Sequence, residues 1–371
     1  MRIGILTLHS GTNYGGTLQC YSLYRTLLDR GFKVKIIDFV PARVAPLYKR
    51  IFFRLTSYSF KQLFNSIHSK RRTHVVRNSS TQLRRIFDKF RDDNLHLTER
   101  VDEYTISKLN SEFDVIIIGS DQVWSSYVRE KLTYFGDWFP QYKGRLISYA
   151  ACATNENYPM ARKFKIRNLL KQFSAISVRD ITSKNIIKKF IPHCQIDVVL
   201  DPTQMYDFPE VKNSISLISQ PYILVYVLGS ELSIGNKRIV DFIRNHGAYK
   251  NTKVIAVTIY DCDVQYADET LKTVKPLDWV KLIKHADVVL TDSFHASVFA
   301  MKFKTPCIGY YCEANRASRL IHLFQESNLS DFLISNETDL LDLELDFGEQ
   351  YLNYKPIDRE SSFSFLIHNI R

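Results

Sequence analysis

Residues 286–310 read ADVVLTDSFHASVFAMKFKTPCIGY, and this stretch decides the fold. Its apolar run at 288–290 predicts a short strand that is buried on both faces, as strands of parallel sheets are. Polar residues follow, a helix is expected over 296–302, and Pro306 opens the next strand. This order of strand, loop, helix and strand predicts an α/β fold.

The loop of this unit carries the first catalytic candidate, His295. Ligands bind at the carboxyl ends of strands in open α/β sheets, and a helix N-terminus at that place favours anions. One alternative stays open: Asp292 and Ser293 only cap the helix, and His295 packs beside them.

The composition of the 371-residue chain is that of a globular protein with two domains. Hydrophobic residues make up 45% and aromatic residues 13%, which is enough for two packed cores. The apolar run at the N-terminus is about six residues long, too short for a signal peptide or a membrane span. The six cysteines are scattered without a C-x-x-C pair, so we expect a reduced, cytoplasmic protein without bound metal.

The net charge of +11 comes from one segment. Residues 43–91 contain 13 lysines or arginines against one acid, so they carry +12 and the rest of the chain −1. Aromatic and aliphatic residues accompany these charges and predict a basic helical insertion over 43–94. Such helices lie on an anionic membrane, form a solvated lid over the active site, or bind nucleic acid; we expect no nucleic-acid partner.

Strand and helix patterns alternate along the chain in two successive series. The series are separated between Thr203 and Gln220, where Pro209, the flanking prolines at 202 and 221 and the lack of a clear period predict a linker. We therefore expect two Rossmann-like doubly wound domains with a cleft between them, at 1–205 and 220–355, and a terminal helix at 356–371.

A polar cluster follows the strand that is predicted over 113–119. The run GSDQVW places Ser120, Asp121 and Gln122 beside Trp124. Proteins hold sugars with carboxylate and amide hydrogen bonds and an aromatic platform, so this run is a candidate sugar site. A helix cap with a packed tryptophan would have the same sequence.

The first predicted turn contains Asn13, Tyr14, Gly15 and Gly16, directly before a helix expected over 17–30. Backbone N–H groups at such a helix start can bind an oxyanion. The glycines suit an ordinary tight turn equally well, so both interpretations stay open.

Three arginines are candidates for binding an anionic ligand. Arg179 ends a strand, where its guanidinium can hold a phosphate or carboxylate, or pair with Asp180 or Asp201 in a structural ion pair. Arg316 and Arg319 lie one helical turn apart and suit a phosphorylated ligand. The same spacing also occurs on helix surfaces that bind no ligand.

Six segments between residues 2 and 325 share their order with a known family: NYGGTLQCYSL, FDVIIIGSDQVW, ISYAA, ISVRD, VLDPT and WVKLIKHADVVLTDSFHASVFAMKFKTPCIGY. Together they resemble the polysaccharide pyruvyl transferase family. The resemblance implies a GT-B-like pair of Rossmann-like domains, with the acceptor on the N-terminal side and the donor on the C-terminal side. It also implies a transferase that moves a pyruvyl group from phosphoenolpyruvate (PEP) to a sugar of a cell-surface polysaccharide or its lipid-linked precursor, forming a pyruvate ketal.

The resemblance and this chemistry together give each candidate residue an expected role. His295 is the catalytic histidine, and Asp292 or Asp121 orients it or accepts a hydroxyl proton. The residues expected to contact the donor are Arg179, Ser293, Phe294, Arg316 and Arg319. Those expected to contact the acceptor are Asn13, Tyr14, Gly15, Gln19, Ser120, Gln122 and Trp124. No metal is expected, and no cofactor besides PEP as co-substrate.

One departure from the family pattern concerns the donor. Members often carry an arginine two residues before the histidine, where this chain has Ser293. Either Arg316 or Arg319 supplies the missing positive charge, or the donor differs.

Two alternative functions stay open. A GT-B glycosyltransferase would hold the diphosphate of a nucleotide-sugar donor with Arg316 and Arg319. A non-catalytic component of polysaccharide assembly would bind the membrane surface through the basic helices. In each case we expect a cytoplasmic protein, peripheral at the inner face of the cell membrane where those helices attach it.

Overall fold

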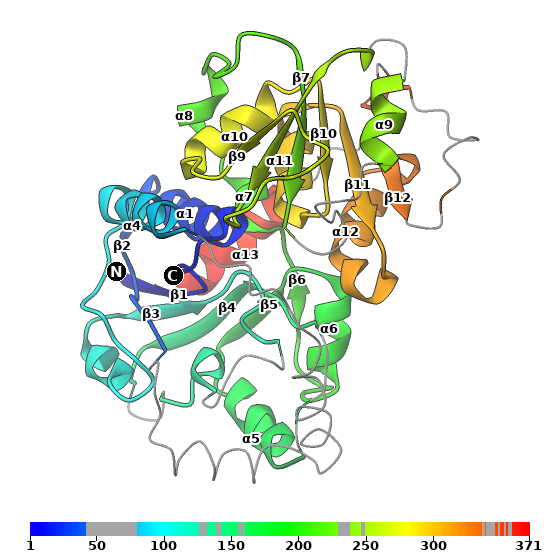
Figure 1. The fold of residues 1–371 in the computed structure, drawn as a ribbon. Coiled ribbons are helices and arrows are strands. Elements are labelled where there is room, and N and C mark those ends of the chain that lie inside the picture. Colours follow the sequence, from blue (N-terminus) through cyan, green and yellow to red (C-terminus); the bar gives the residue numbers. More distant parts are fainter. Residues whose placement is uncertain are drawn as a thin grey trace, which may run out of the picture.

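A computed structural model shows two α/β domains, one above the other in Figure 1. It describes the chain apart from residues 42–79, 126–131, 139–141, 155–157, 159, 229–237, 246–248, 336–337, 339–345, 348, 352–353 and 355–357. Most of the basic insertion expected over 43–94 lies outside the described residues. Its last part is a helix, α4 (Thr81–Asn94), as expected.

The first domain is built on six parallel strands in the order β2–β1–β3–β4–β5–β6. In chain order they are β1 (Arg2–Leu6), β2 (Lys33–Ile36), β3 (Val115–Ile118), β4 (Arg145–Ala151), β5 (Ala175–Val178) and β6 (Asp197–Val198). The crossovers carry α1 (Tyr14–Leu28), α4, the 3₁₀ turns η1 (Ile106–Ser111) and η2 (Thr133–Phe135), α5 (Met160–Leu170) and α6 (Ile181–Lys188). Every residue of β3 is buried because helices cover both faces of the sheet.

The second domain has a parallel sheet of its own, in the order β12–β11–β10–β7–β8–β9. Its strands are β7 (Tyr222–Val227), β8 (Lys253–Thr258), β9 (Glu269–Leu271), β10 (Val288–Thr291), β11 (Cys307–Tyr311) and β12 (Leu333–Ser335). The helices are α9 (Arg238–Asn245), α10 (Pro276–Lys284), α11 (Phe294–Phe303) and α12 (Ala314–Glu326), with the 3₁₀ turn η5 (Ser330–Phe332). The predicted fold class of two Rossmann-like doubly wound domains is confirmed.

The chain crosses between the domains twice. Two short helices, α7 (Pro202–Met205) and α8 (Pro209–Lys212), lie between the sheets in the sequence. The terminal helix α13 (Glu360–Ile370) returns to the first domain, where the hydroxyl of Ser362 accepts the backbone N–H of Leu200 at 2.9 Å. Within the described residues, no helix has the length and apolarity that a membrane span requires.

An aromatic cluster joins the two domains. Tyr14, at the start of α1, stacks on Trp279 of α10 with 5.0 Å between ring centres, and its hydroxyl donates to the carbonyl of Val274 at 2.8 Å. Tyr226 of β7 packs edge-on against both rings. The first helix of one domain is thus part of the core of the other, which fixes the loops at the two sets of strand ends relative to each other.

Candidate active site

Three charged side chains meet where the domains face each other: Arg179, Asp201 and His295. Arg179 follows β5, Asp201 caps α7, and His295 lies in the first turn of α11. Nη1 of Arg179 lies 3.0 Å from Oδ2 of Asp201, and Nε2 of His295 lies 3.6 Å from the same oxygen. Each residue is at most 7% exposed. Strand ends of both sheets therefore build one buried cluster, where ligands bind in such folds.

The carboxylate of Asp201 is the centre of this cluster. Its Oδ2 also accepts the hydroxyl of Ser120 at 3.0 Å, and its Oδ1 accepts the backbone N–H and the hydroxyl of Thr203 at 3.0 and 2.7 Å. Burial acts to raise the pKa of Asp201, but the charges and hydrogen bonds of its neighbours, His295 and Arg179 first among them, lower that pKa well below its usual range. Asp201 is therefore an anion that holds Arg179 and His295 in place.

Arg179 has hydrogen-bonding capacity left over. Among the described residues its Nε and Nη2 have no hydrogen-bond partner, although the side chain is only 2% exposed. A buried donor without an acceptor is costly unless a ligand supplies one. The guanidinium carbon lies 4.7 Å from the ring centre of Phe294, which helps to hold its plane. A planar guanidinium with two unfilled donors suits a carboxylate or a phosphate.

His295 reaches this cluster through a gap left by a glycine. A Cβ atom at Gly15 would lie 2.2 Å from Nδ1 of His295 and 2.5 Å from its Cγ, so a larger residue would displace the ring. Gly15 was expected to contact the acceptor; in the structure it packs against the catalytic candidate. The first turn of α1 begins at Tyr14, three residues earlier than predicted, because Asn13 caps it by accepting the N–H of Gly16 at 3.0 Å.

The other residues around His295 act through the backbone. Ser293 caps α11 by accepting the N–H of Ala296 at 3.4 Å, which is the capping alternative considered above. Oδ1 of Asp292 accepts the backbone N–H of Leu228 at 3.1 Å. The carboxylate that the structure places beside His295 belongs to Asp201, not to Asp292.

Two cavities border the cluster. One has a volume of 350 Å³ and is lined by Arg179, Phe294 and Arg319, three of the expected donor residues. The other has a volume of 430 Å³ and is lined by Asn13, an expected acceptor residue, and by Asp121, an expected catalytic residue. The three donor candidates and Asn13 therefore face separate cavities. Arg316 lies on α12, but its side chain is outside the described residues.

Asp121 links the cluster to the second of these cavities. Its Oδ1 lies 3.8 Å from Nη1 of Arg179, and its side chain is 17% exposed. The backbone of Asp121 has a φ of +68°, a left-handed conformation that costs free energy in any residue other than glycine. Such strained positions are common at functional sites. Gln122, the next residue, is half-buried.

Four expected acceptor residues have no exposed surface at all: Tyr14, Gln19, Ser120 and Trp124. The ring of Trp124 stacks on Phe135, and its indole N–H donates to the carbonyl of Tyr134 at 2.8 Å. The amide of Gln19 donates to the hydroxyl of Thr7 at 2.9 Å. These four residues pack behind the site in the structure, and that they contact a sugar stays a prediction.

The sequence gives little indication that two residues, Asp201 and His9, belong to the site. Asp201 could be considered only as an ion-pair partner of Arg179, although its position before Pro-Thr at a strand end suits a helix cap. His9 lines the 430 Å³ cavity, and its Nε2 lies 3.1 Å from Oδ1 of the buried Asp38. Arg91 of α4 donates to the backbone carbonyl of His9 at 3.3 Å and so anchors this loop.

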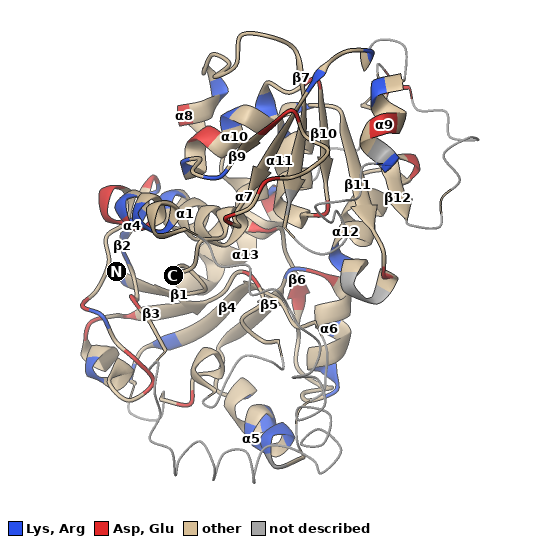
Figure 2. Ribbon diagram, viewed as in Figure 1, with Lys and Arg blue, Asp and Glu red and all other residues tan. Residues whose placement is uncertain are grey.

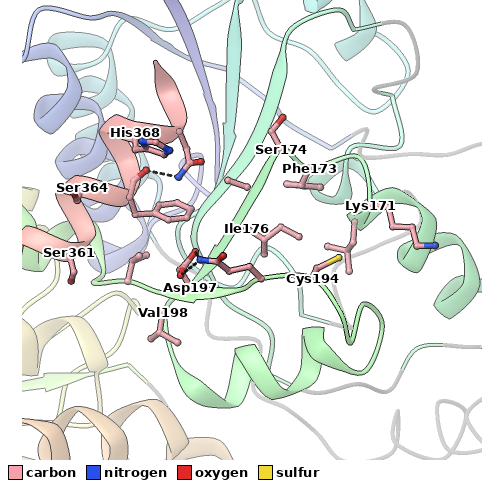
Figure 3. A pocket seen from close by; sticks show the side chains of 16 residues that line it. Lys171, Phe173, Ser174, Ile176, Cys194, Asp197, Val198, Ser361, Ser364 and His368 are labelled. Atoms are coloured by element: carbon pink, nitrogen blue, oxygen red, sulfur yellow. Dashed lines mark hydrogen bonds between the residues drawn. The ribbon is translucent and has the colours of Figure 1, made fainter.

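A larger cavity lies away from the cluster. It has a volume of 690 Å³ and opens at the edge of the first sheet, between α13 and β6. Figure 3 shows Ser361, Ser364 and His368 on one wall and Ile176 and Asp197 on the other. None of the expected site residues lines it, so cavity size does not mark the site. In the part of the chain that the structure describes, no group of three or more His, Cys, Asp or Glu residues could hold a metal ion.

Solved structures with a similar fold include two that are described as UDP-GlcNAc 2-epimerases. A UDP-GlcNAc 2-epimerase from Methanocaldococcus jannaschii, in complex with UDP-GlcNAc and UDP, has a TM-score of 0.52 and 16% identity, covering 100% of this chain and 99% of that one. A protein assigned as a UDP-N-acetylglucosamine 2-epimerase from Listeria monocytogenes has a TM-score of 0.55 and 12% identity, covering 100% and 95%. At these identities the likeness shows the fold alone, which is the GT-B arrangement.

Sequence comparison identifies the family. No curated protein sequence matches the chain. The family model for polysaccharide pyruvyl transferases matches residues 13–313, which include Asp121, Arg179, Asp201 and His295. The match extends from the N-cap of α1 to the N-cap of α12 and includes every strand of the two sheets except β1 and β12. The chain therefore belongs to the polysaccharide pyruvyl transferase family.

Proposed function

We propose that the protein transfers a pyruvyl group from PEP to two hydroxyls of one sugar, forming a pyruvate ketal and releasing phosphate. The observation that carries this proposal is the buried Arg179, whose Nε and Nη2 lack partners among the described residues while Asp201 holds its Nη1. PEP offers a carboxylate and a phosphate, the two groups to which a guanidinium binds best. The adjoining 350 Å³ cavity would hold the donor, with Arg319 as a second cation.

The reaction has a simple balance of atoms. The methylene carbon of PEP takes up a proton and becomes a methyl group, which makes the neighbouring carbon electrophilic. Two sugar hydroxyls add to that carbon, and its bond to the phosphate oxygen breaks. One of the two hydroxyl protons replaces the proton given to carbon, and the other leaves with the phosphate.

The residues of the cluster fit these steps. His295 would give the proton to the methylene carbon and later take one from a hydroxyl, a role typically worth ~10²–10⁴ in rate. Asp201, 3.6 Å from its Nε2, would position the ring. Asp121, which lines the 430 Å³ cavity, would accept the proton of the other hydroxyl. The acceptor would bind in that cavity, beside Asn13.

The proposed acceptor is a cell-surface polysaccharide or its lipid-linked precursor. PEP is a cytoplasmic metabolite, so we place the reaction in the cytoplasm, at the inner face of the cell membrane when the acceptor is attached to lipid. Only PEP is required as co-substrate in this scheme. Attachment through the basic insertion at 43–94 stays a prediction, because most of that segment lies outside the described residues.

Donor identity tests this proposal directly. The protein is incubated with PEP labelled with ¹³C at the methylene carbon and a panel of sugar acceptors, and phosphate release is measured. A methyl resonance of a ketal, appearing together with phosphate, is the expected result. Release of a nucleoside diphosphate from a nucleotide sugar, with PEP left intact, would instead support a GT-B glycosyltransferase.

A further inference from the structure

The outward face of α5 carries apolar side chains where a helix in water would be polar. Met160 is 82% exposed and Phe164, one turn later, is 68% exposed. The helix already buries a different face through Ile166, Leu169 and Leu170. The exposed pair is therefore not part of the domain core. The contact of these two large apolar side chains with water is unfavourable in free energy.

Basic residues surround this pair. Residues 160–171 contain five lysines or arginines and no acid. Arg167 is exposed and continues the line that Met160 and Phe164 begin, because residues three and four apart share one helix face, and the exposed Lys171 follows directly after the last residue of the helix. Figure 2 shows these basic positions on α5, at the end of the first domain that is farthest from the second.

We propose that this α5 stripe, formed by Met160, Phe164, Arg167 and Lys171, docks the protein on an anionic lipid surface. Apolar side chains gain free energy when they leave water for the boundary between headgroups and acyl chains. Lysines and arginines near an anionic leaflet add electrostatic attraction. Apolar and basic residues side by side on one exposed helix face are the pattern of helices that lie in a membrane interface.

The location of α5 gives this docking a consequence for the acceptor. The helix packs against η2, whose Tyr134 lines the 430 Å³ cavity. Nζ of Lys165 lies 3.8 Å from Oδ2 of Asp137, two residues after η2, and ties the two elements together. A membrane at α5 would thus lie close to the cavity in which a lipid-linked acceptor is proposed to bind. Docking itself rests on the surface alone and does not require the proposed activity.

Vesicle flotation tests the proposal without measuring catalysis. The full chain should float with vesicles of anionic phospholipid at low salt and not with zwitterionic vesicles. Met160→Ser/Phe164→Ser should lower the partition constant about tenfold or more, since two apolar side chains no longer leave water. Arg167→Gln/Lys171→Gln should lower it about tenfold at low salt. Two matched controls should leave it unchanged: Ile215→Ser/Leu217→Ser, which are 84% and 50% exposed, and Lys108→Gln/Lys143→Gln.

A fluorescent probe locates the contact. The native tryptophans are at most 8% exposed, so a Trp at an exposed position reports on its own surroundings. Phe164→Trp should be quenched by lipids with brominated chains, and Ile215→Trp should not. The proposal is overturned if the wild type fails to float, if Met160→Ser/Phe164→Ser floats as well as the wild type, or if Trp at position 164 stays unquenched on bound protein. In the last two cases membrane binding belongs to another part of the chain.

Discussion

At the scale of single residues, the buried pair of Arg179 and Asp201 changes what mutation of the arginine should do. A donor-binding role alone would leave stability untouched. Because the pair is at 3.0 Å and 2% and 0% exposed, Arg179→Ala leaves a carboxylate buried without its main partner. We expect a loss of about 3–5 kcal/mol in the free energy of unfolding. Urea unfolding of Arg179→Ala, Asp201→Asn and the double variant measures it; additive effects would show that the pair is not coupled.

His295 should behave in the opposite way, since it makes no hydrogen bond through Nε2 among the described residues. His295→Asn should keep the melting temperature within a few degrees and lower kcat by ~10²–10⁴, the range of a general acid. Steady-state kinetics with PEP and circular dichroism melting measure both quantities. Retention of more than about a tenth of wild-type kcat would remove His295 from the proton-transfer role.

Asp201 also predicts how stability depends on pH. Its pKa is lowered in the folded protein, so the unfolded chain binds more protons below its own pKa of about 3.9. The stabilisation is complete above that pH and is lost as the pH falls further. Between about pH 4 and pH 3 the wild type should lose up to about 1.4 kcal/mol more than Asp201→Asn. Urea unfolding at a series of pH values checks this; parallel curves would mean that Asp201 is not charged in the fold.

At the scale of elements, the first turn of α1 and the first turn of α11 meet across the domain boundary. Gly15→Ala places a Cβ 2.2 Å from Nδ1 of His295, so the imidazole must move away from Asp201. We expect a large loss of kcat with a smaller change in the KM for PEP. Gly16→Ala, in the same helical turn, is the matched control, because the nearest atom to its Cβ is the carbonyl oxygen of Leu8 at 3.5 Å, an ordinary contact.

Gly16→Ala should lose far less activity than Gly15→Ala, since its methyl group borders the 430 Å³ cavity but not His295, and it should gain up to about 1 kcal/mol from its higher helix propensity. The two variants differ in where the added methyl group points, not in the helix that they change. If kinetics and melting temperature respond alike to both, the contact between Gly15 and His295 has no functional weight.

The element from β10 to α11 was predictable because a buried apolar run, a capping serine and a proline are local signals. Tyr14 and Trp124 were not, because their burial depends on Trp279 and Phe135, which come from other parts of the chain. The central role of Asp201 is equally non-local: its partners come from β3, β5 and α11.

At the scale of the whole molecule, the aromatic cluster at the boundary should make the two domains unfold together. Tyr14 belongs to the first domain by sequence, yet it is 0% exposed between Trp279, Tyr226 and Phe87. Two domains that share a core of this kind lose it together, so one calorimetric transition is expected, with equal calorimetric and van't Hoff enthalpies.

Tyr14→Ala should break this coupling. It removes the ring that joins the domains, at a cost of about 3–5 kcal/mol, and should separate the melting curve into two transitions. Phe324→Ala, a 0% exposed residue inside the second domain, should cost a similar amount and leave a single transition, because the boundary stays intact. Scanning calorimetry of the three proteins distinguishes these outcomes. Two transitions in the wild type would show that the domains are independent, and His295 would then meet Asp201 only while they are closed together.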